Sequence, residues 1–192
     1  MTGMEKHSGG QAVFQLRVQL QEVRPVVWRR VLVPGSVRLS KLAAMLLTTM
    51  GWENSHLHQF RIADAHYGMH ADDWEDVDED EIDEKTVSVL RAIGDERRFF
   101  FDYDFGDGWE HEIVIEQLTW SSEGLKFAVC IDGENACPPE DVGGVGGYED
   151  FLAAIEDPDH EEHDNLLGWV GFLFDPTVFD LGSVNAELQR IR

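Results

Sequence analysis

Hydrophobic and polar residues alternate from residue 13 to residue 21, near the start of the chain. The apolar set is Phe14, Leu16, Val18 and Leu20, and the polar set is Gln15, Arg17, Gln19 and Gln21. Because successive side chains of a strand point to opposite faces, this pattern predicts a half-buried strand of an antiparallel sheet. Residues 26–33, between Pro25 and Pro34, predict a second strand that forms a hairpin with the first.

A helix is predicted over residues 39–50, where apolar residues recur at helical spacing. The positions that carry the pattern are Leu39, Leu42, Leu46 and Met50. Ser36 or Ser40 could cap the start, and Gly51 stands where a left-handed residue commonly ends a helix. The apolar arc is wide, so we expect the helix to pack deeply against the sheet.

Alternation also marks strands over residues 56–62, 98–116 and 126–131. Within residues 98–116, Gly106-Asp107-Gly108 predicts the tight turn of a hairpin. A short helix is expected over residues 86–93.

Helices are also expected near the end of the chain, after a glycine-rich segment at residues 143–147 that we expect to be flexible. One helix covers residues 148–156, a second opens at a capping box over residues 159–162, and a third is capped by Ser183.

The order of these elements is hairpin, helix, strand, hairpin and then helices. Strict alternation of strands and helices is missing, which argues against a doubly wound parallel sheet. The sequence predicts an α+β fold, in which an antiparallel or mixed sheet of hairpins packs on a central helix, in a β-grasp-like arrangement with additional C-terminal helices. We expect one domain over residues 12–192 and a flexible N-terminus over residues 1–11.

Acidic residues dominate the composition, with 38 Asp and Glu against 15 Lys and Arg and a formal net charge of -23. Nucleic acids are bound largely through Lys and Arg contacts to phosphates, so a nucleic-acid partner is disfavoured. The chain has no long apolar stretch and no apolar leader, and its two cysteines, Cys130 and Cys137, are too few for a disulfide scaffold. These features predict a cytoplasmic protein with reduced thiols and no membrane contact.

The acid is concentrated in one run. Ten of the thirteen residues from Asp72 to Glu84 are Asp or Glu. Like charges at this density repel one another and resist burial, so the run is expected to be a solvated loop. It also suggests that the chain could act as a DNA mimic.

Three groups of residues together resemble a known family. They are Pro25-Val26-Val27-Trp28-Arg29-Arg30 with Val33-Pro34-Gly35; Gly51-Trp52-Glu53-Asn54-Ser55-His56-Leu57-His58-Gln59-Phe60; and Tyr103–His111 with Cys137–Gly144 and Gly147-Tyr148. The chain is similar to the plasmid pRiA4b ORF-3-like family over nearly its whole length after the first ten residues. The resemblance implies a shared fold and an association with plasmids and mobile elements, but no activity. Members often carry a His and a Gln where this chain has Ala43 and Leu47, so a function of that His is not expected here.

The densest group of chemically capable side chains combines histidines and carboxylates. It consists of His56, His58, Asp104, Asp107, His111 and Glu112, with Glu140 and Asp141 from a later loop. Alternation places His58 and His111 on inward, apolar faces, where two nearby imidazoles could bind a metal or exchange a proton. Alternatively, both are core histidines bonded to backbone or carboxylate. The residues expected in the core or around the rim of a pocket are Trp28, Trp52 and Trp109.

The loop after Cys137 admits more than one interpretation. Pro138 and Pro139 could hold Glu140 and Asp141 for a cation or for acid–base chemistry, or could only fix a loop over the sheet edge. Cys130 could join Cys137 and two histidines in a zinc site, although no zinc-motif spacing is present. The glycines of this region lack the Gly-Lys-Ser/Thr ending of a phosphate loop. No cofactor is predicted beyond a divalent metal at this patch.

Three functions follow from these features. The first, and the one preferred, is a non-catalytic binding or accessory protein associated with mobile elements, which recognises a protein partner through its acidic surface and a Trp-rich groove. The second is a metal-dependent, hydrolase-like enzyme that uses the His and carboxylate patch. The third is a DNA-mimic regulator. The sequence leaves open whether the chain is an enzyme and what its oligomeric state is.

Overall fold

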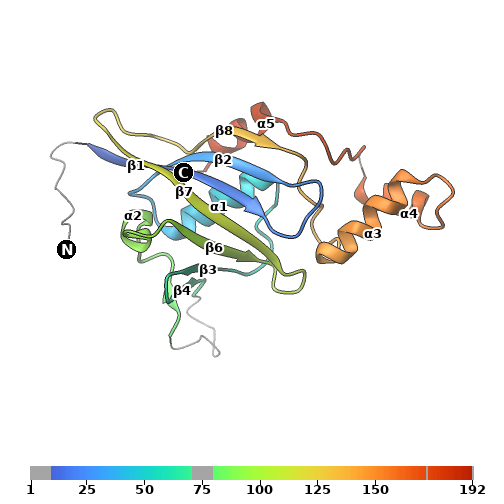
Figure 1. The fold of residues 1–192 in the computed structure, drawn as a ribbon, viewed down its shortest axis with the longest axis horizontal. Helices are drawn as coiled ribbons and strands as arrows, with labels where there is room; N and C mark the ends of the chain where they lie inside the picture. The colour runs from blue at the N-terminus through green and yellow to red at the C-terminus, as the bar shows by residue number, and fades with distance from the viewer. Residues whose placement is uncertain (1–9, 71–79, 172, 192) are drawn as a thin grey trace.

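The computed structural model describes residues 10–70, 80–171 and 173–191, which form one mixed sheet with helices packed around it (Figure 1). The strands are β1 (Gln11–Leu20), β2 (Trp28–Pro34), β3 (His58–Ile62), β4 (Ala65–Gly68), β5 (Ile82–Asp83), β6 (Arg98–Tyr103), β7 (Trp109–Ser121) and β8 (Val129–Glu134). The helices are α1 (Leu39–Met50), α2 (Val89–Ile93), α3 (Gly144–Glu156), α4 (His163–Val170) and α5 (Leu181–Leu188).

The strand order across the sheet is β5-β4-β3-β6-β7-β1-β2-β8. Both predicted hairpins are present: Val18 of β1 pairs with Arg29 of β2, and Phe101 of β6 pairs with His111 of β7. The β4–β5 pair is parallel and the other pairs are antiparallel. The α+β class and the mixed sheet on a central helix are confirmed, and the β-grasp likeness stays a prediction.

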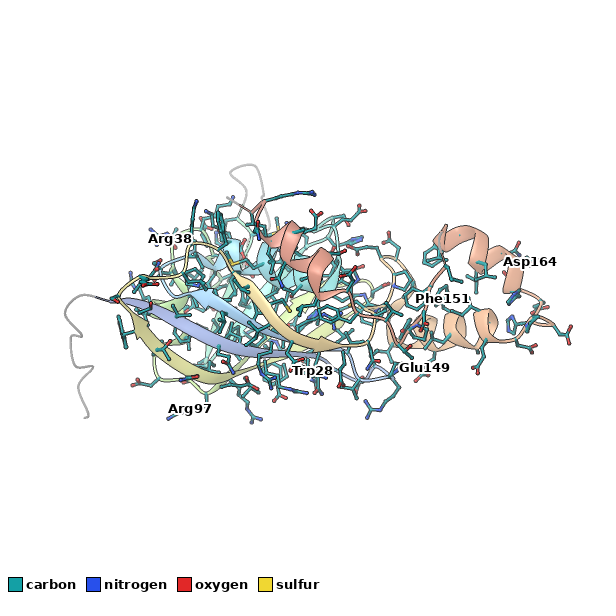
Figure 2. All side chains as sticks on the ribbon, turned by 90° about the horizontal axis from the view of Figure 1, so that it is seen from above. Trp28, Arg38, Arg97, Glu149, Phe151 and Asp164 are labelled. Atoms are coloured by element: carbon teal, nitrogen blue, oxygen red, sulfur yellow. The ribbon has the colours of Figure 1, made fainter. Side chains whose placement is uncertain are left out.

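One face of the sheet packs against α1 (Figures 1 and 2). The alternating residues of β1 that were expected to be apolar and inward are buried there, together with Phe60, Phe101 and Ile113 of the neighbouring strands. Helix α1 contributes Leu42 and Leu46, which are also buried. Each such side chain contributes roughly 1.5–3 kcal/mol when it leaves water, so this layer is the main source of stability.

Helix α1 begins and ends at the residues predicted, but its start is not capped as expected. Neither Ser36 nor Ser40 is the N-cap; Arg38 is, and its side chain makes no capping bond. The backbone N–H of Leu39 donates instead to the carbonyl of Val87, over 3.0 Å. A tertiary contact with the segment before α2 therefore satisfies the first backbone N–H of α1, and no serine side chain caps the helix.

The glycine-rich segment at residues 143–147 is not a flexible loop, because α3 begins inside it at Gly144. A Cβ on Gly144 would lie 2.4 Å from the carbonyl oxygen of Asp107, and one on Gly147 would lie 2.1 Å from that of Val142. Gly144 therefore allows the start of α3 to approach the β6–β7 turn closely, and Gly147 allows α3 to pack against the loop before it. The helices α3 and α4, which carry Phe151 and Asp164, project from one end of the sheet (Figures 1 and 2).

The two other caps predicted for C-terminal helices are wrong. The residue before α4 is Glu162, which makes no side-chain capping bond, so residues 159–162 do not act as a capping box. Helix α5 is capped by Asp180, whose Oδ1 accepts from the N–H of Ser183 over 2.9 Å. Ser183 is therefore the third residue of the helix rather than its cap. Aspartate and serine both serve as caps, and the backbone conformation at Asp180 decides between them.

The acidic run is structured at its C-terminal end, and residues 71–79 lie outside the described residues. Strand β5 pairs with β4, and Glu84 beyond it is buried against His58. The prediction of a solvated loop is wrong for this end, because an imidazole supplies the partner that makes burial of a carboxylate tolerable.

The expected flexible N-terminus lies outside the described residues up to residue 9, and its last residue, Gln11, already belongs to β1. No helix in the described parts of the chain is both long enough and apolar enough to cross a membrane.

Candidate functional site

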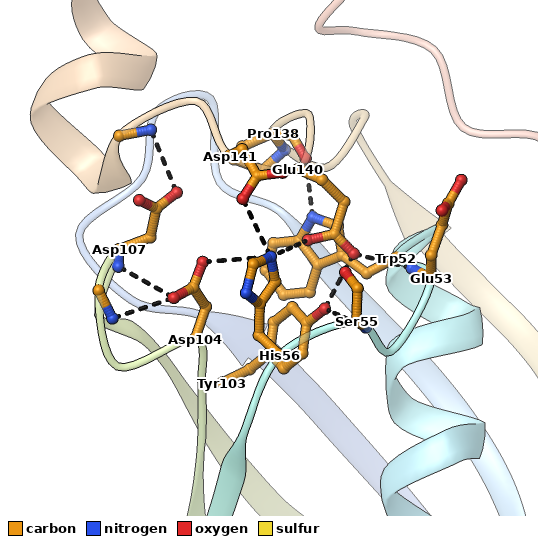
Figure 3. A network of polar contacts seen from close by, with 12 residues as sticks. Trp52, Glu53, Ser55, His56, Tyr103, Asp104, Asp107, Pro138, Glu140 and Asp141 are labelled. Carbon is orange, nitrogen blue, oxygen red and sulfur yellow. Dashed lines mark hydrogen bonds and ion pairs between the residues drawn. The ribbon is translucent and has the colours of Figure 1, made fainter.

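Side chains from three separate segments meet where β3 begins and β6 ends (Figure 3). His56 precedes β3, Asp104 follows β6, and Glu140 and Asp141 belong to the loop before α3. Nε2 of His56 lies 3.0 Å from Oδ1 of Asp141, 3.7 Å from Oδ2 of Asp104 and 3.9 Å from Oε2 of Glu140. We call these four residues the His56 cluster.

Two carboxylates of the cluster are held through the oxygen that faces away from His56. Oδ1 of Asp104 accepts from the N–H groups of Gly106 and Asp107, over 3.0 and 3.3 Å. Oε1 of Glu140 accepts from the hydroxyl of Tyr103 over 2.9 Å and from the N–H of Glu53 over 2.8 Å. Burial raises the pKa of Tyr103, so the phenol keeps its proton and acts as donor.

The loop that carries Glu140 and Asp141 is tied down on both sides. The indole N–H of Trp52 donates to the carbonyl of Pro138 over 2.9 Å, and Oδ2 of Asp107 accepts from the N–H of Gly143 over 3.1 Å. The double-proline loop is therefore fixed over the end of the sheet, where β3 begins and β6 ends. The same anchoring brings its carboxylates to His56.

Charge and backbone conformation set this cluster apart. Three carboxylates face one imidazole, and the buried atoms Nε2 of His56 and Oε2 of Glu140 have no hydrogen-bond partner of adequate geometry. The 3.0 Å contact to Asp141 is short enough for a hydrogen bond but is not aligned as one. Asp104 and Asp141 also have positive φ angles, 51° and 57°, a region that few non-glycine residues adopt.

Within the described residues, His56, Asp104 and Asp141 are the set of potential metal ligands whose donor atoms lie within 4.8 Å of one another. An imidazole nitrogen and carboxylate oxygens that converge in this way can hold a cation or pass a proton.

His58 and His111 point inward as predicted, but they do not form a shared site. They lie on β3 and β7, which β6 separates, and the ring of Phe101 stands between them at 5.4 and 5.5 Å from their centroids. His58 faces Glu84, whereas Nδ1–H of His111 donates to the carbonyl of Phe101 over 2.9 Å. Burial lowers the pKa of His111 to about 4, so this ring is neutral at physiological pH.

The remaining predicted residues lie in different places. Glu112 faces the outer side of the sheet beside Arg98. Trp52 and Trp109 lie close together in the interior, with their ring centroids 5.7 Å apart. Trp28 is not part of a rim with them, because it lies on the outer face of the sheet (Figure 2). There the guanidinium groups of Arg17 and Arg30 each lie 5.2 Å from the centroid of its ring.

The cysteines take no part in a metal site among the described residues. Both thiols are free, and burial raises the pKa of Cys130 and of Cys137, so both remain protonated near neutral pH. The two-Cys, two-His zinc site is therefore not formed, since neither sulfur lies in the group of converging ligand atoms.

Two groups at this site were missed from the sequence. Tyr103 was seen only as an alternating core residue, and the backbone N–H of Glu53 carries no sequence signal at all. Tyr103 is the last residue of β6 and directly precedes Asp104. A buried tyrosine needs a partner for its hydroxyl, and this need is the signal that could have suggested a polar contact here.

Comparisons with known proteins find a family model, a curated relative and a solved structure that resemble this chain over most of its length. Residues 12–183 match the plasmid pRiA4b ORF-3-like protein family. The uncharacterized protein y4hQ of Sinorhizobium fredii (strain NBRC 101917 / NGR234) is 44% identical over 162 residues, which cover 83% of this chain and 81% of that protein. The crystal structure of the protein of unknown function MM3350 from Methanosarcina mazei Go1 matches with a TM-score of 0.80 and 30% identity, covering 90% of this chain and 97% of that one. The chain therefore belongs to the plasmid pRiA4b ORF-3-like family.

Proposed function

We propose that the chain binds a divalent cation through His56, Asp104 and Asp141, with Glu140 beside them. The observation that carries the proposal is the convergence of one imidazole nitrogen and two carboxylate oxygens within 4.8 Å. Ligand atoms that share a cation at about 2.0–2.2 Å lie roughly 3–3.5 Å apart. The contacts of 3.0 and 3.7 Å from Nε2 of His56 already approach that spacing.

The charges of the His56 cluster favour binding of a cation. Three carboxylates beside one imidazole leave the site with excess negative charge, and like charges at this separation repel. Donors from Tyr103 and from the backbone hold the outer oxygens of Glu140 and Asp104, which leaves the inner oxygens to face His56. Such outer hydrogen bonds orient ligands in established metal sites.

The donor set favours particular cations. One imidazole with carboxylates and no thiolate suits Mn²⁺, Fe²⁺ or Zn²⁺. Ca²⁺ and Mg²⁺ prefer ligand sets composed of oxygen alone. We therefore expect Mn²⁺ and Zn²⁺ to bind more tightly than Ca²⁺ or Mg²⁺.

The test is titration calorimetry on protein prepared without a His-tag and freed of metal by a chelator that is then removed. We expect one equivalent of Zn²⁺ or Mn²⁺ to bind per chain. Asp141→Asn should weaken binding on the order of 100-fold, because it removes a charged ligand while its exposed position spares the fold.

Asp132→Asn is the matched control, because Asp132 is an exposed carboxylate that pairs with Arg30 on β2. It should leave the affinity for the cation unchanged. The proposal fails if no saturable binding is measured, or if Asp132→Asn weakens binding as much as Asp141→Asn.

A hydrolytic activity at the same site is a second candidate, and the position of Glu140 favours it. Its Oε1 is fixed by two donors, while its buried Oε2 lies 3.9 Å from His56 and accepts no hydrogen bond. This oxygen could take a proton from an attacking water and return it to a leaving group. Glu140→Gln should then abolish hydrolysis of a chromogenic ester, measured at a Zn²⁺ concentration that saturates the variant. Hydrolysis that survives this change, or that is absent from the loaded wild type, rules this candidate out.

A further inference from the structure

A groove of about 800 Å³ opens beside the His56 cluster. It is lined by the end of α1 with Met50 and Trp52, by the Pro138–Asp141 loop, and by residues 173–175 and 178–180 between α4 and α5. In Figure 1 this last segment returns from the projecting helices to α5 at the end of the chain. The volume is in the range of sites that enclose a ligand or a few side chains of a partner.

Large apolar side chains are exposed along the C-terminal wall. Trp169 is 48% exposed, Val178 58% and Leu173 91%, and all three line the groove. Burial of apolar surface is worth roughly 25 cal/mol per Å², so a partner that covers these side chains would gain binding free energy. Since Leu173 is almost fully exposed, the occupant must extend over the wall and not only fill the groove.

The groove is also acidic. The carboxylates that line it are Glu53, Glu140, Asp141, Asp175 and Asp180. Hydrogen bonds from Thr177 and from Ser183 lower the pKa of Asp175 and of Asp180, so both are ionised at neutral pH.

The cation that lines the groove, Arg29, is already committed to the fold. Its guanidinium donates to the carbonyls of Thr49, Trp28, Glu134 and Asn135, and it stacks on the ring of Phe179 at 3.9 Å. Five carboxylates against this one guanidinium leave the groove as an apolar surface bordered by net negative charge.

We propose that this groove docks an extended segment of a partner protein in which basic side chains alternate with apolar ones. The apolar side chains would cover Leu173 and Val178, and the basic ones would meet the carboxylates. A second copy of this chain is a poor occupant, because its own net charge of -23 would be brought against the same acidic groove. Nucleic acid is excluded by the same repulsion.

The probe for the test is a short fluorescent peptide in which lysine alternates with leucine, measured by anisotropy at low salt. Two peptides of equal length serve as comparisons: lysine with serine keeps the charge, and glutamate with leucine keeps the apolar side chains. We expect the lysine–leucine peptide to bind with one-to-one saturation, at least roughly tenfold more tightly than either comparison. Equal binding of the lysine–serine peptide would reduce the contact to non-specific charge attraction and overturn the proposal.

Two variants locate the binding. Leu173→Ser and Glu53→Gln change exposed side chains, and the carboxylate of Glu53 points away from His56 (Figure 3). Each should weaken the lysine–leucine peptide by roughly fivefold to tenfold. The controls are Leu118→Ser and Asp132→Asn, which change an exposed apolar and an exposed acidic residue on the sheet and should have no effect. Equal weakening by the controls overturns the proposal.

Light scattering completes the test. If the chain forms a dimer that Leu173→Ser converts to a monomer, the groove is a self-interface and the proposal is wrong. The groove shares Glu140 and Asp141 with the proposed cation site, so the peptide is measured on metal-free protein. His56→Ala should abolish binding of Zn²⁺, while the peptide should still bind the metal-free variant. Binding of Zn²⁺ and binding of the peptide are measured separately, so failure of one proposal can be told apart from failure of the other.

Discussion

Nε2 of His58 lies 2.9 Å from Oε2 of Glu84, and both side chains are only 3% exposed. The contact joins β3 to the chain directly after β5, which is the edge strand of the sheet. A carboxylate from the most acidic run of the sequence is thereby used inside the protein. The acid at this end of the run serves the fold, so the DNA-mimic hypothesis gains no support from Glu84.

Removal of Glu84 should be costly. Glu84→Ala leaves the imidazole of His58 buried without its partner, and loss of one member of a buried pair costs roughly 3–5 kcal/mol of the free energy of unfolding. Urea denaturation measures the loss. Glu187→Ala is the control, because Glu187 pairs with Arg190 on the surface and should lose less than about 1 kcal/mol. Similar losses in both variants would show that the buried pair contributes no more to the free energy of unfolding than the surface pair does.

His111 should make the protein less stable in mild acid. Burial lowers its pKa from 6.5 to about 4, so above pH 6.5 the ring is neutral in both the folded and the unfolded chain. As the pH falls from 6.5 toward about 4, the unfolded chain binds a proton that the folded chain excludes, so the free energy of unfolding decreases. The full effect is roughly 3 kcal/mol.

The variant that isolates this effect is His111→Asn, whose amide N–H can still donate to the carbonyl of Phe101. Denaturant unfolding across this pH range should show a shallower loss of stability than in the wild type, because the other histidines contribute equally to both. Parallel curves for the two proteins would contradict the prediction.

Tyr103 and Tyr148 form a matched pair for the proposed cation site. Tyr103→Phe removes the donor to Oε1 of Glu140 and should weaken binding of Zn²⁺ by roughly tenfold, as loss of an outer hydrogen bond does in metal sites. Tyr148→Phe removes a buried hydroxyl that has no hydrogen-bond partner, so it should leave the affinity unchanged and raise the thermal midpoint. Titration calorimetry and thermal unfolding measure both quantities. Equal affinities of the two variants for Zn²⁺ would contradict the prediction that Tyr103 positions Glu140 for the cation.

Two glycines should respond in opposite directions to alanine. Gly51 ends α1 with a φ of 98°, so Gly51→Ala is strained and should lower the free energy of unfolding by about 1 kcal/mol or more. Gly168 lies within α4, and a Cβ added to it would have no other atom within 4 Å, so Gly168→Ala should raise the free energy of unfolding by roughly 0.5–1 kcal/mol. Chemical denaturation distinguishes the two, and a change of the same sign in both would contradict the helix assignments.

The apolar–polar pattern of the sequence was enough to predict those elements in which the pattern repeats over many residues. The strand near residues 13–21, the helix over residues 39–50 and the hairpin around Gly106-Asp107-Gly108 all appear as predicted. Each is defined by a periodicity that matches one face of the element to the core, and periodicity is visible in the sequence alone. Caps and short strands such as β4 and β5 lack such repetition, and their hydrogen bonds depend on residues outside the element.

The candidate residues were recognised by type, but their partners were decided by the tertiary structure. The sequence singled out His56, Asp104 and Asp141, yet it stressed His58 and His111, which the order of the strands keeps apart with Phe101 between them. Only the folded chain closes the Pro138–Asp141 loop over the sheet and brings carboxylates from distant segments to one imidazole. Side-chain identity fixes which chemistry is available, whereas loop closure and strand order fix which groups meet, because those contacts join residues far apart in the chain.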